Sequence, residues 1–172
     1  MKTVSIPENV TALESYAFYE SGIESVTFAA NCKIEKINPH TFASSKLISV
    51  MIPDSVNYID DNAFRDCLSL QTVTLGAADN LQIHANAFYN TAISALTIPA
   101  NVEYIGEYAF IGLKNLSAYV VDENNEWYQS VDGVLYSKDG RTLIAFPAGR
   151  EGSFEVPATV ETIGFRAFYG CT

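Results

Sequence analysis

The residues that could do chemistry are few and far apart. The chain has two histidines, and neither has a second ligand or base at a fixed short spacing: His40 lies two residues before a phenylalanine and His84 four before another. Cys32, Cys67 and Cys171 form no CxxC pair, which favours small core residues over a redox or metal centre. There is no nucleophile elbow, P-loop or dinucleotide-binding glycine motif. We therefore predict a protein that is not an enzyme and needs no cofactor or metal.

One loop combines oxygen-bearing side chains with aromatic rings. Asp122–Trp127, "DENNEW", has oxygens at alternate positions, as a calcium loop does, but lacks the glycine and the bidentate glutamate of such a loop. A solvated loop is the alternative. Trp127 and Tyr128 either bind a sugar or protein partner, or pack as a lid on the following segment, and packing is favoured.

The composition is that of a folded, acidic protein. Hydrophobic residues make up 48% of the chain and charged residues 17%. The formal net charge of −10 repels phosphate backbones and anionic lipids, so nucleic acid and membrane surfaces are disfavoured as partners. No stretch nears the ~18 apolar residues of a membrane span, and we expect no membrane insertion.

The sequence contains an internal repeat, and the strands and turns that position these residues follow from it. The segment "IPDSVNYIDDNAF" (52–64) returns as "IPANVEYIGEYAF" (98–110). Apolar residues that close strand-like triplets recur at steps of 22, 24, 23, 23 and 23: Ile6, Phe28, Ile52, Leu75, Ile98 and Val121. Phenylalanines that follow Ala or Thr recur at steps of 24, 22, 24, 22 and 58: Phe18, Phe42, Phe64, Phe88, Phe110 and Phe168. A period near 23 indicates a solenoid, whose stacked units bury one another.

Each repeat unit reads as one strand, one corner and one turn. Pro53 ends a strand because it offers no N–H to a ladder. Val56 and Ile59 then point back into the core, and Ala63-Phe64 closes the turn. We predict a mainly β, leucine-rich-repeat-like right-handed coil of about seven units with one parallel sheet, forming a single domain over residues 1–172.

One unit is enlarged. The step of 58 holds two periods and 12 further residues, which places a 35-residue unit between Val121 and Val156, and we assign it no Ala-Phe turn. Val134–Tyr136 and Thr142–Phe146 are strand-like and flank an Asp-Gly turn, so we predict a β-hairpin that projects from one edge of the solenoid. Gly140 is expected at positive φ.

The pattern V-x-I-P-x-x-V-x-x-I-x-x-x-A-F-x-x-C resembles the BspA-type leucine-rich repeats of bacterial and protozoan surface proteins. "SVDGVLYSKDGRTLIAFPAG" (130–149) resembles a variant unit of that family. The units that begin at Phe28 and Leu75 lack the proline, so we expect differently shaped strand ends there. The resemblance implies a secreted or cell-surface protein that adheres to host proteins or to other cells.

Both ends look cut. The first strand begins at Val4 without a polar cap, and Thr172 stands partway through a unit, so we expect a segment excised from a longer array. The rival interpretation is a complete small protein whose bare edges associate end to end with another copy.

The outward face of the predicted sheet is the candidate interaction face. It is rich in Ser and Thr, which suits either a structural ladder or a shallow binding surface for a protein or glycan. Its residues are Glu24, Thr27, Ile48, Ser49, Met51, Gln71, Thr72, Thr74, Ser94 and Thr97. Ile48 and Met51 are the expected hot spot, and Trp127 with Tyr128 is a secondary candidate. The favoured function is an extracellular binding or adhesion module. The alternative is a structural spacer within a larger multidomain surface protein.

Overall fold

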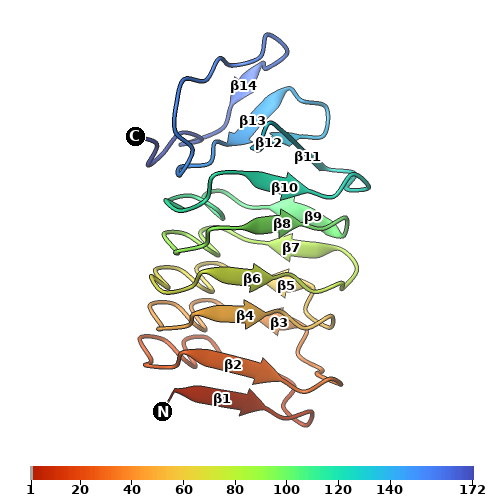
Figure 1. Ribbon diagram of the computed structural model, residues 1–172. Helices are drawn as coiled ribbons and strands as arrows, with labels where there is room; N and C mark the ends of the chain where they lie inside the picture. The colour runs from red at the N-terminus through yellow and green to blue at the C-terminus, as the bar shows by residue number, and fades with distance from the viewer. Residues whose placement is uncertain (1) are drawn as a thin grey trace.

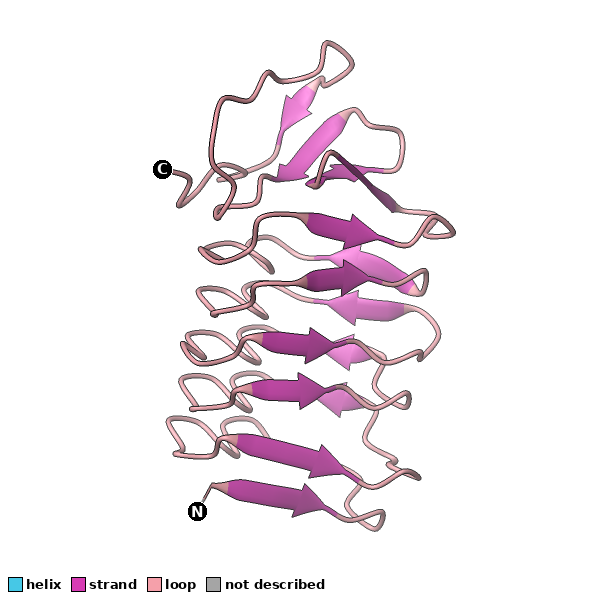
Figure 2. Cartoon of the chain, in the orientation of Figure 1, coloured by secondary structure: helices cyan, strands magenta, loops and turns pink. Residues whose placement is uncertain are grey.

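The computed structural model describes residues 2–172, and these form a stacked coil of fourteen short strands (Figure 1). Figure 2 shows strands and loops repeating in regular layers from the N-terminal end as far as β10 (Tyr119–Val121), beyond which the strands are arranged differently. The predicted β-solenoid is confirmed. This part of the chain contains no helix, and so none long and apolar enough to cross a membrane.

The first column of strands is the predicted parallel sheet. Its members share one direction, with inward and outward side chains alternating. They are β1 (Thr3–Ile6), β2 (Ser25–Phe28), β4 (Ser49–Met51), β6 (Thr72–Thr74), β8 (Leu96–Ile98) and β10 (Tyr119–Val121). They form a four-stranded sheet (β1-β2-β4-β6) and a two-stranded sheet (β8-β10). Val50 and Val73 are register partners and both are buried, whereas their neighbours Met51 and Thr74 are partners on the exposed side.

A second parallel sheet was not predicted. It consists of β3 (Lys36–Ile37), β5 (Tyr58–Ile59), β7 (Leu81–Ile83) and β9 (Val102–Ile105). The repeat pattern predicts only a corner here, since two to four residues are too short to show an alternating pattern. Stacking brings the corners of successive units into backbone hydrogen-bond register, so Ile59 pairs with Ile37 on one side and Ile83 on the other.

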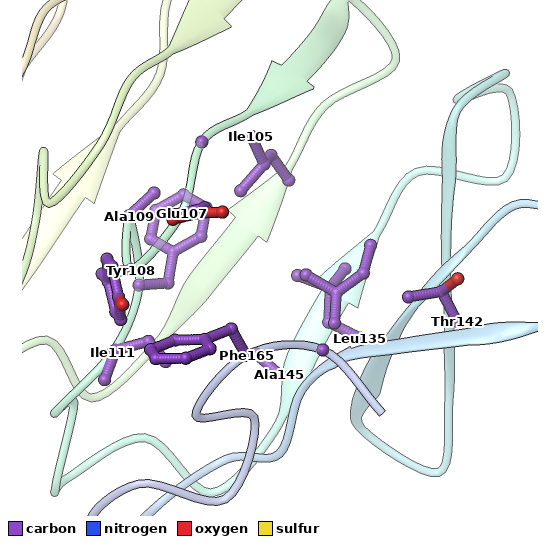
Figure 3. Close-up of a pocket in the computed structure, with 13 residues that line it drawn as sticks. Ile105, Glu107, Tyr108, Ala109, Ile111, Leu135, Thr142, Ala145 and Phe165 are labelled. Atoms are coloured by element: carbon purple, nitrogen blue, oxygen red, sulfur yellow. The ribbon is translucent and has the colours of Figure 1, made fainter. Parts of the chain in front are cut away.

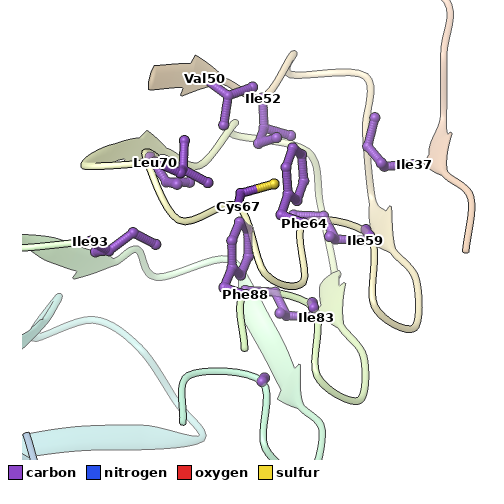
Figure 4. Close-up of a cluster of buried hydrophobic side chains, with 14 of the residues drawn as sticks. Ile37, Val50, Ile52, Ile59, Phe64, Cys67, Leu70, Ile83, Phe88 and Ile93 are labelled. Atoms are coloured by element: carbon purple, nitrogen blue, oxygen red, sulfur yellow. The ribbon is translucent and has the colours of Figure 1, made fainter. Parts of the chain in front are cut away.

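The turns stack as regularly as the strands. The rings of Phe18, Phe42, Phe64, Phe88 and Phe110 follow one another with centroids 5.1–5.7 Å apart, and Figure 4 shows part of this core around Cys67. Each turn contains two residues at positive φ, and these are Tyr16 and Glu20, His40 and Ser44, Asn62 and Asp66, Asn86 and Asn90, Tyr108 and Gly112. The left-handed residues direct backbone N–H groups along the stack, so that the Phe64 N–H donates to the Ala87 carbonyl (2.8 Å).

The predicted hairpin of the enlarged unit is present and has a third strand. β12 (Val134–Ser137) pairs antiparallel with β13 (Thr142–Ala145), and Gly140 has φ 73°. β11 (Tyr128–Val131) pairs with the other edge of β12 through a turn at Asp132 and Gly133, both at positive φ. β13 then pairs parallel with β14 (Thr162–Ile163).

Two expectations about the enlarged unit are wrong. The unit does have an Ala-Phe turn, Ala145-Phe146, because the Phe146 N–H donates to Ala167 (2.8 Å) and its ring stacks on Phe168 at 5.1 Å. The hairpin also does not project from an edge. Leu135 belongs to the main core, whereas Phe146 belongs to a second, smaller core, so the hairpin is a layer of the stack with both faces buried.

Candidate functional site

The first column of strands opens in its middle. β1 and β2 are paired at four positions and β4 and β6 at three, but β2 and β4 are paired only at Ser25 and Ser49. Beyond that pair the two strands diverge, and a groove of about 470 Å³ lies at the carboxyl ends of β2, β4 and β6. We call this the β2–β4 groove.

The positions of the prolines account for part of the divergence, because Pro53 has no N–H to donate toward the end of β2. Ala29 stands where other units have proline, and its N–H donates to the Ile6 carbonyl (3.0 Å), a bond that proline cannot make. The end of β2 therefore stays with β1. On the other side the Ile52 N–H donates to the Thr74 carbonyl (2.9 Å), so the end of β4 stays with β6. The gap between the two bonded pairs is the groove.

Apolar side chains line the β2–β4 groove, with hydroxyl groups at its mouth. Phe28, Pro53 and Leu75 lie along it, and Met51, 69% exposed, lies beside them. The wall at Gly76 is tight, because a Cβ there would lie 2.5 Å from the Pro53 carbonyl oxygen. Such a surface can accept an apolar side chain or the flat face of a sugar ring.

A second, smaller hollow follows the unit that begins at Leu75, which also lacks proline. β6 and β8 are joined only by a bridge between Thr72 and Ala95, and a hollow of about 340 Å³ lies between them. Thr74, Thr97 and Pro99 also line it. Both hollows of this sheet therefore occur where a repeat unit departs from the common pattern.

The structure brings together some of the candidate residues and separates others. Thr27, Met51 and Thr74 meet at the β2–β4 groove, and Thr72 and Thr97 line the second hollow. The remaining candidates lie along the outward face away from both: Glu24, Ile48, Ser49, Gln71 and Ser94. Glu24 is half-buried and paired with Lys2 at 2.8 Å, and Ile48 is 47% exposed.

Sequence reasoning missed the apolar residues that line the two hollows. Phe28, Leu75 and Pro99 were assigned only as strand-closing anchors or strand ends. The signal that could have found them was the absence of proline after Phe28 and Leu75.

The loop with Trp127 and Tyr128 is tied to the array by a buried amide. The Asn125 side chain is fully buried, and its Nδ2 donates to the carbonyls of Pro99 (2.9 Å) and Val102 (3.0 Å). Its Oδ1 accepts the N–H groups of Trp127 (2.9 Å) and Tyr128 (2.8 Å). The side chain of Trp127 remains 39% exposed.

Tyr128 itself ends the second sheet. Its hydroxyl accepts the Ile105 N–H at 2.8 Å, in the place where another strand would otherwise accept it. Burial raises the pKa of this hydroxyl, which therefore stays protonated in neutral solution. Tyr128 is thus engaged in the structure, and Trp127 is the more accessible of the two rings.

A cluster of ionisable side chains lies on the outer face of the second sheet. Ligand atoms of Asp60, Asp61 and His84 lie within 4.8 Å of one another, a grouping hidden in the sequence because the residues come from successive units. Asp60 is paired with Lys36 at 2.7 Å. The ion pair with Lys36 and the stacking of His84 on Tyr58 (centroids 4.1 Å apart) join side chains of adjacent units.

Cys67 is a core residue, as predicted. Its thiol donates to the Phe42 carbonyl at 3.0 Å, and burial raises its pKa to about 11, so the reactive thiolate is suppressed. Cys32 and Cys171 are half-buried, and no disulfide joins the three.

Comparison with known proteins identifies the repeat. The profile of the family described as "BspA type Leucine rich repeat region" matches six copies over residues 1–117 and 145–172. The unmatched segment, 118–144, contains β10, β11, β12 and most of β13. No curated protein matches the chain.

Three solved structures are similar to this one. The pneumococcal vaccine antigen PcpA superposes with a TM-score of 0.92 at 29% identity, covering 97% of this chain and 42% of that one. A leucine rich cell surface protein from Faecalibacterium prausnitzii has a TM-score of 0.71 at 28% identity, covering 99% of this chain and 59% of that one. A leucine-rich repeat protein from Eubacterium ventriosum has a TM-score of 0.69 at 26% identity, covering 86% and 45%. The chain thus spans less than two thirds of each.

Proposed function

The chain belongs to the BspA-type leucine-rich repeat family, and on this premise we propose that it is a non-enzymatic module of a secreted or cell-surface protein, which binds a protein or glycan partner. A surface location is supported by the similar protein from Faecalibacterium prausnitzii, which is described as a cell surface protein. Nucleic acid and membrane insertion are not part of the proposal, because the net charge of −10 repels phosphate groups and anionic lipids.

The observation that carries the proposal is the β2–β4 groove. It joins an apolar lining to exposed hydroxyl groups, and it lies on a stack whose backbone is fixed by parallel ladders on two sides. A rigid surface loses little conformational entropy on binding. Met51 lies at its rim with most of its side chain in solvent, as expected of a residue that a partner covers. Repetition along a longer array would multiply weak contacts of this kind.

The experiment changes the groove without touching the core. Met51→Glu and Thr74→Lys together place two charges on exposed positions. The wild type and the double variant are compared in a pull-down against extracellular matrix proteins, on a glycan array and in cell adhesion. We expect binding to be lost while the melting temperature is kept. Binding that the double variant retains in full would exclude this face.

A structural spacer is the second candidate. It is favoured by the run of stacked phenylalanine rings from Phe18 to Phe110, which makes this part of the array a continuous rod. A catalytic or anchoring domain on the same polypeptide, together with a wild-type module that binds nothing in the three assays, would favour the spacer over the binding module.

A further inference from the structure

The backbone ladder of the turns is interrupted at one place. In the turn before it, the Asn86 N–H donates to the Glu107 carbonyl (3.0 Å) and the Phe88 N–H to the Ala109 carbonyl (2.9 Å). Tyr108 and Phe110 hold the same two positions in the next turn, and Tyr108 has the same left-handed backbone (φ 62°). Neither of their N–H groups has a backbone acceptor in the enlarged unit. Within residues 2–172 these two N–H groups therefore have no backbone acceptor, and neither has the N–H of Gly112, which holds the position of Asn90.

The enlarged unit leaves this space because its turn is short. Phe110 is the fifth residue after Ile105, whereas Phe146 is only the third residue after Leu143, which is equivalent to Ile105. β13 also pairs with β12 and β14, and not with β9. The result is a crevice of about 210 Å³ between the Phe110 turn and β13, which we call the junction crevice.

Apolar side chains form the walls of the junction crevice. Figure 3 shows Tyr108, Ile111 and Phe165 on one side and Leu135 with Thr142 on the other. Phe165 is 66% exposed and meets Tyr108 edge-on at 5.4 Å. The crevice therefore combines apolar walls with two backbone donors on alternate residues.

We propose that the junction crevice binds an extended peptide segment of a protein partner, which continues the interrupted ladder. Donors on alternate residues match the carbonyls that an extended chain presents on one side. Within the solenoid, the carbonyls of Glu107 and Ala109 take this role for the preceding turn. An aliphatic or aromatic side chain of the peptide enters between Phe165 and Leu135. The bound peptide removes two unpaired N–H groups and covers an exposed ring.

The first test measures the two donors in the free protein. Amide hydrogen exchange, followed by NMR, compares Phe88 and Phe110, which are equivalent positions in adjacent turns. We expect the Phe110 amide to exchange at least ~100-fold faster, since it lacks the hydrogen bond of Phe88. Equal protection of both amides would show that the donors are not open and would overturn the proposal.

The second test uses linear twelve-residue peptides selected from a phage-displayed library on the whole 172-residue chain. Thr142→Trp fills the mouth of the crevice, and Thr162→Trp, on the paired strand outside it, is the matched control. We expect selected peptides to protect the Tyr108 and Phe110 amides, to lose at least about tenfold in affinity for Thr142→Trp, and to bind Thr162→Trp like the wild type.

Two further variants keep this test decisive. Phe165→Ala removes an exposed wall of the crevice and replaces Thr142→Trp if that variant melts early. Met51→Glu changes only the β2–β4 groove, so peptide binding that survives it is independent of the proposed function. Failure to enrich any peptide, or peptides that bind Thr142→Trp and Phe165→Ala as well as wild type, would overturn the proposal.

Discussion

The regular array, residues 2–117, and the enlarged unit with the last turn, residues 118–172, solve the same packing problem differently. In the array each unit adds one strand to the first sheet and one phenylalanine to the stack, and a single core runs through it. In the enlarged unit an antiparallel hairpin is inserted as a layer, with a small core beyond it around Phe146. The array shows how repetition makes a rigid body.

The departures from repetition make the hollows. Two of the units without proline, those that begin at Phe28 and Leu75, each precede a divergence of the first column of strands, and the short turn of the enlarged unit leaves the junction crevice. A perfectly regular solenoid would close all three through its ladders. We conclude that the repeat supplies the rigid frame and its irregular units supply the candidate binding surfaces.

Phe64→Ala is expected to have the largest effect on stability. Phe64 is fully buried between Phe42 and Phe88, and its loss should cost about 3–5 kcal/mol in chemical denaturation. Phe146→Ala is the counterpart in the enlarged unit, where the ring stacks on Phe168 at the edge of a small core, and it should cost about 2 kcal/mol less. Equal costs would show that the two cores behave as one.

Asn125→Ala should come next. The change leaves two carbonyls and two N–H groups without the amide that now bonds to all four, and we expect a loss of about 2–4 kcal/mol. Because this amide joins the loop before the hairpin to the array, the enlarged unit should unfold first, which hydrogen exchange can resolve. Asn124→Ala, with an exposed side chain bonded only to Asp122, is the control and should be nearly neutral.

Gly140→Val should destabilise the domain by roughly 1 kcal/mol or more, because Gly140 has φ 73° and a Cβ there would lie 3.2 Å from Gln129 Nε2. Thermal unfolding measures the change. Gly22→Val is the control, since a Cβ there meets nothing within 4 Å and its φ is not positive. If Gly140→Val melts with the wild type, the hairpin turn does not hold the enlarged unit in place.

The smallest effect belongs to the half-buried ion pair of Lys36 and Asp60. Burial pushes the pKa of Asp60 up, but the hydrogen bond and charge of Lys36 help hold it below its usual value. A lowered folded-state pKa contributes stability above the unfolded value of about 3.9, and this stability is lost as the pH falls through the folded value. Lys36→Ala should therefore cost less than about 1 kcal/mol at pH 7 and nothing at low pH. A cost that persists below pH 3 would point to lost packing on Tyr58 instead.

Much of the fold follows from the sequence, because the repeat carries its own register. The spacing of Ile52 and Phe64 recurs in most units, and the Asp-Gly turn predicts the β12–β13 hairpin correctly. The second sheet could not be read, because its two-residue strands acquire their pairing only when units stack. The Ala145-Phe146 turn was missed because its spacing is shorter than in the other units. Phe146 follows Leu143 by three residues, whereas Phe110 follows the equivalent Ile105 by five.

The candidate site was only partly accessible to sequence reasoning. Alternation along each strand places Met51 and Thr74 outward, but the divergence of β2 from β4 depends on a backbone bond from Ala29 to Ile6 that no pattern displays. The two donors of the junction crevice are backbone N–H groups. Every residue except proline has such a group, so the sequence does not indicate which of them lack an acceptor. The β2–β4 groove and the junction crevice both occur where a unit departs from the common repeat, and only a comparison between units reveals such a departure.

The most direct test of the account compares Met51→Glu with Val120→Glu. The two residues hold the same outward position on strands of the same column, and both are exposed, but only Met51 lines the β2–β4 groove. Both variants and the wild type are titrated against the extracellular matrix protein or glycan that the wild type captures. The account predicts that Met51→Glu loses at least about tenfold in affinity while Val120→Glu binds within about twofold of the wild type. Equal affinities for the two variants, or a larger loss for Val120→Glu, would contradict it.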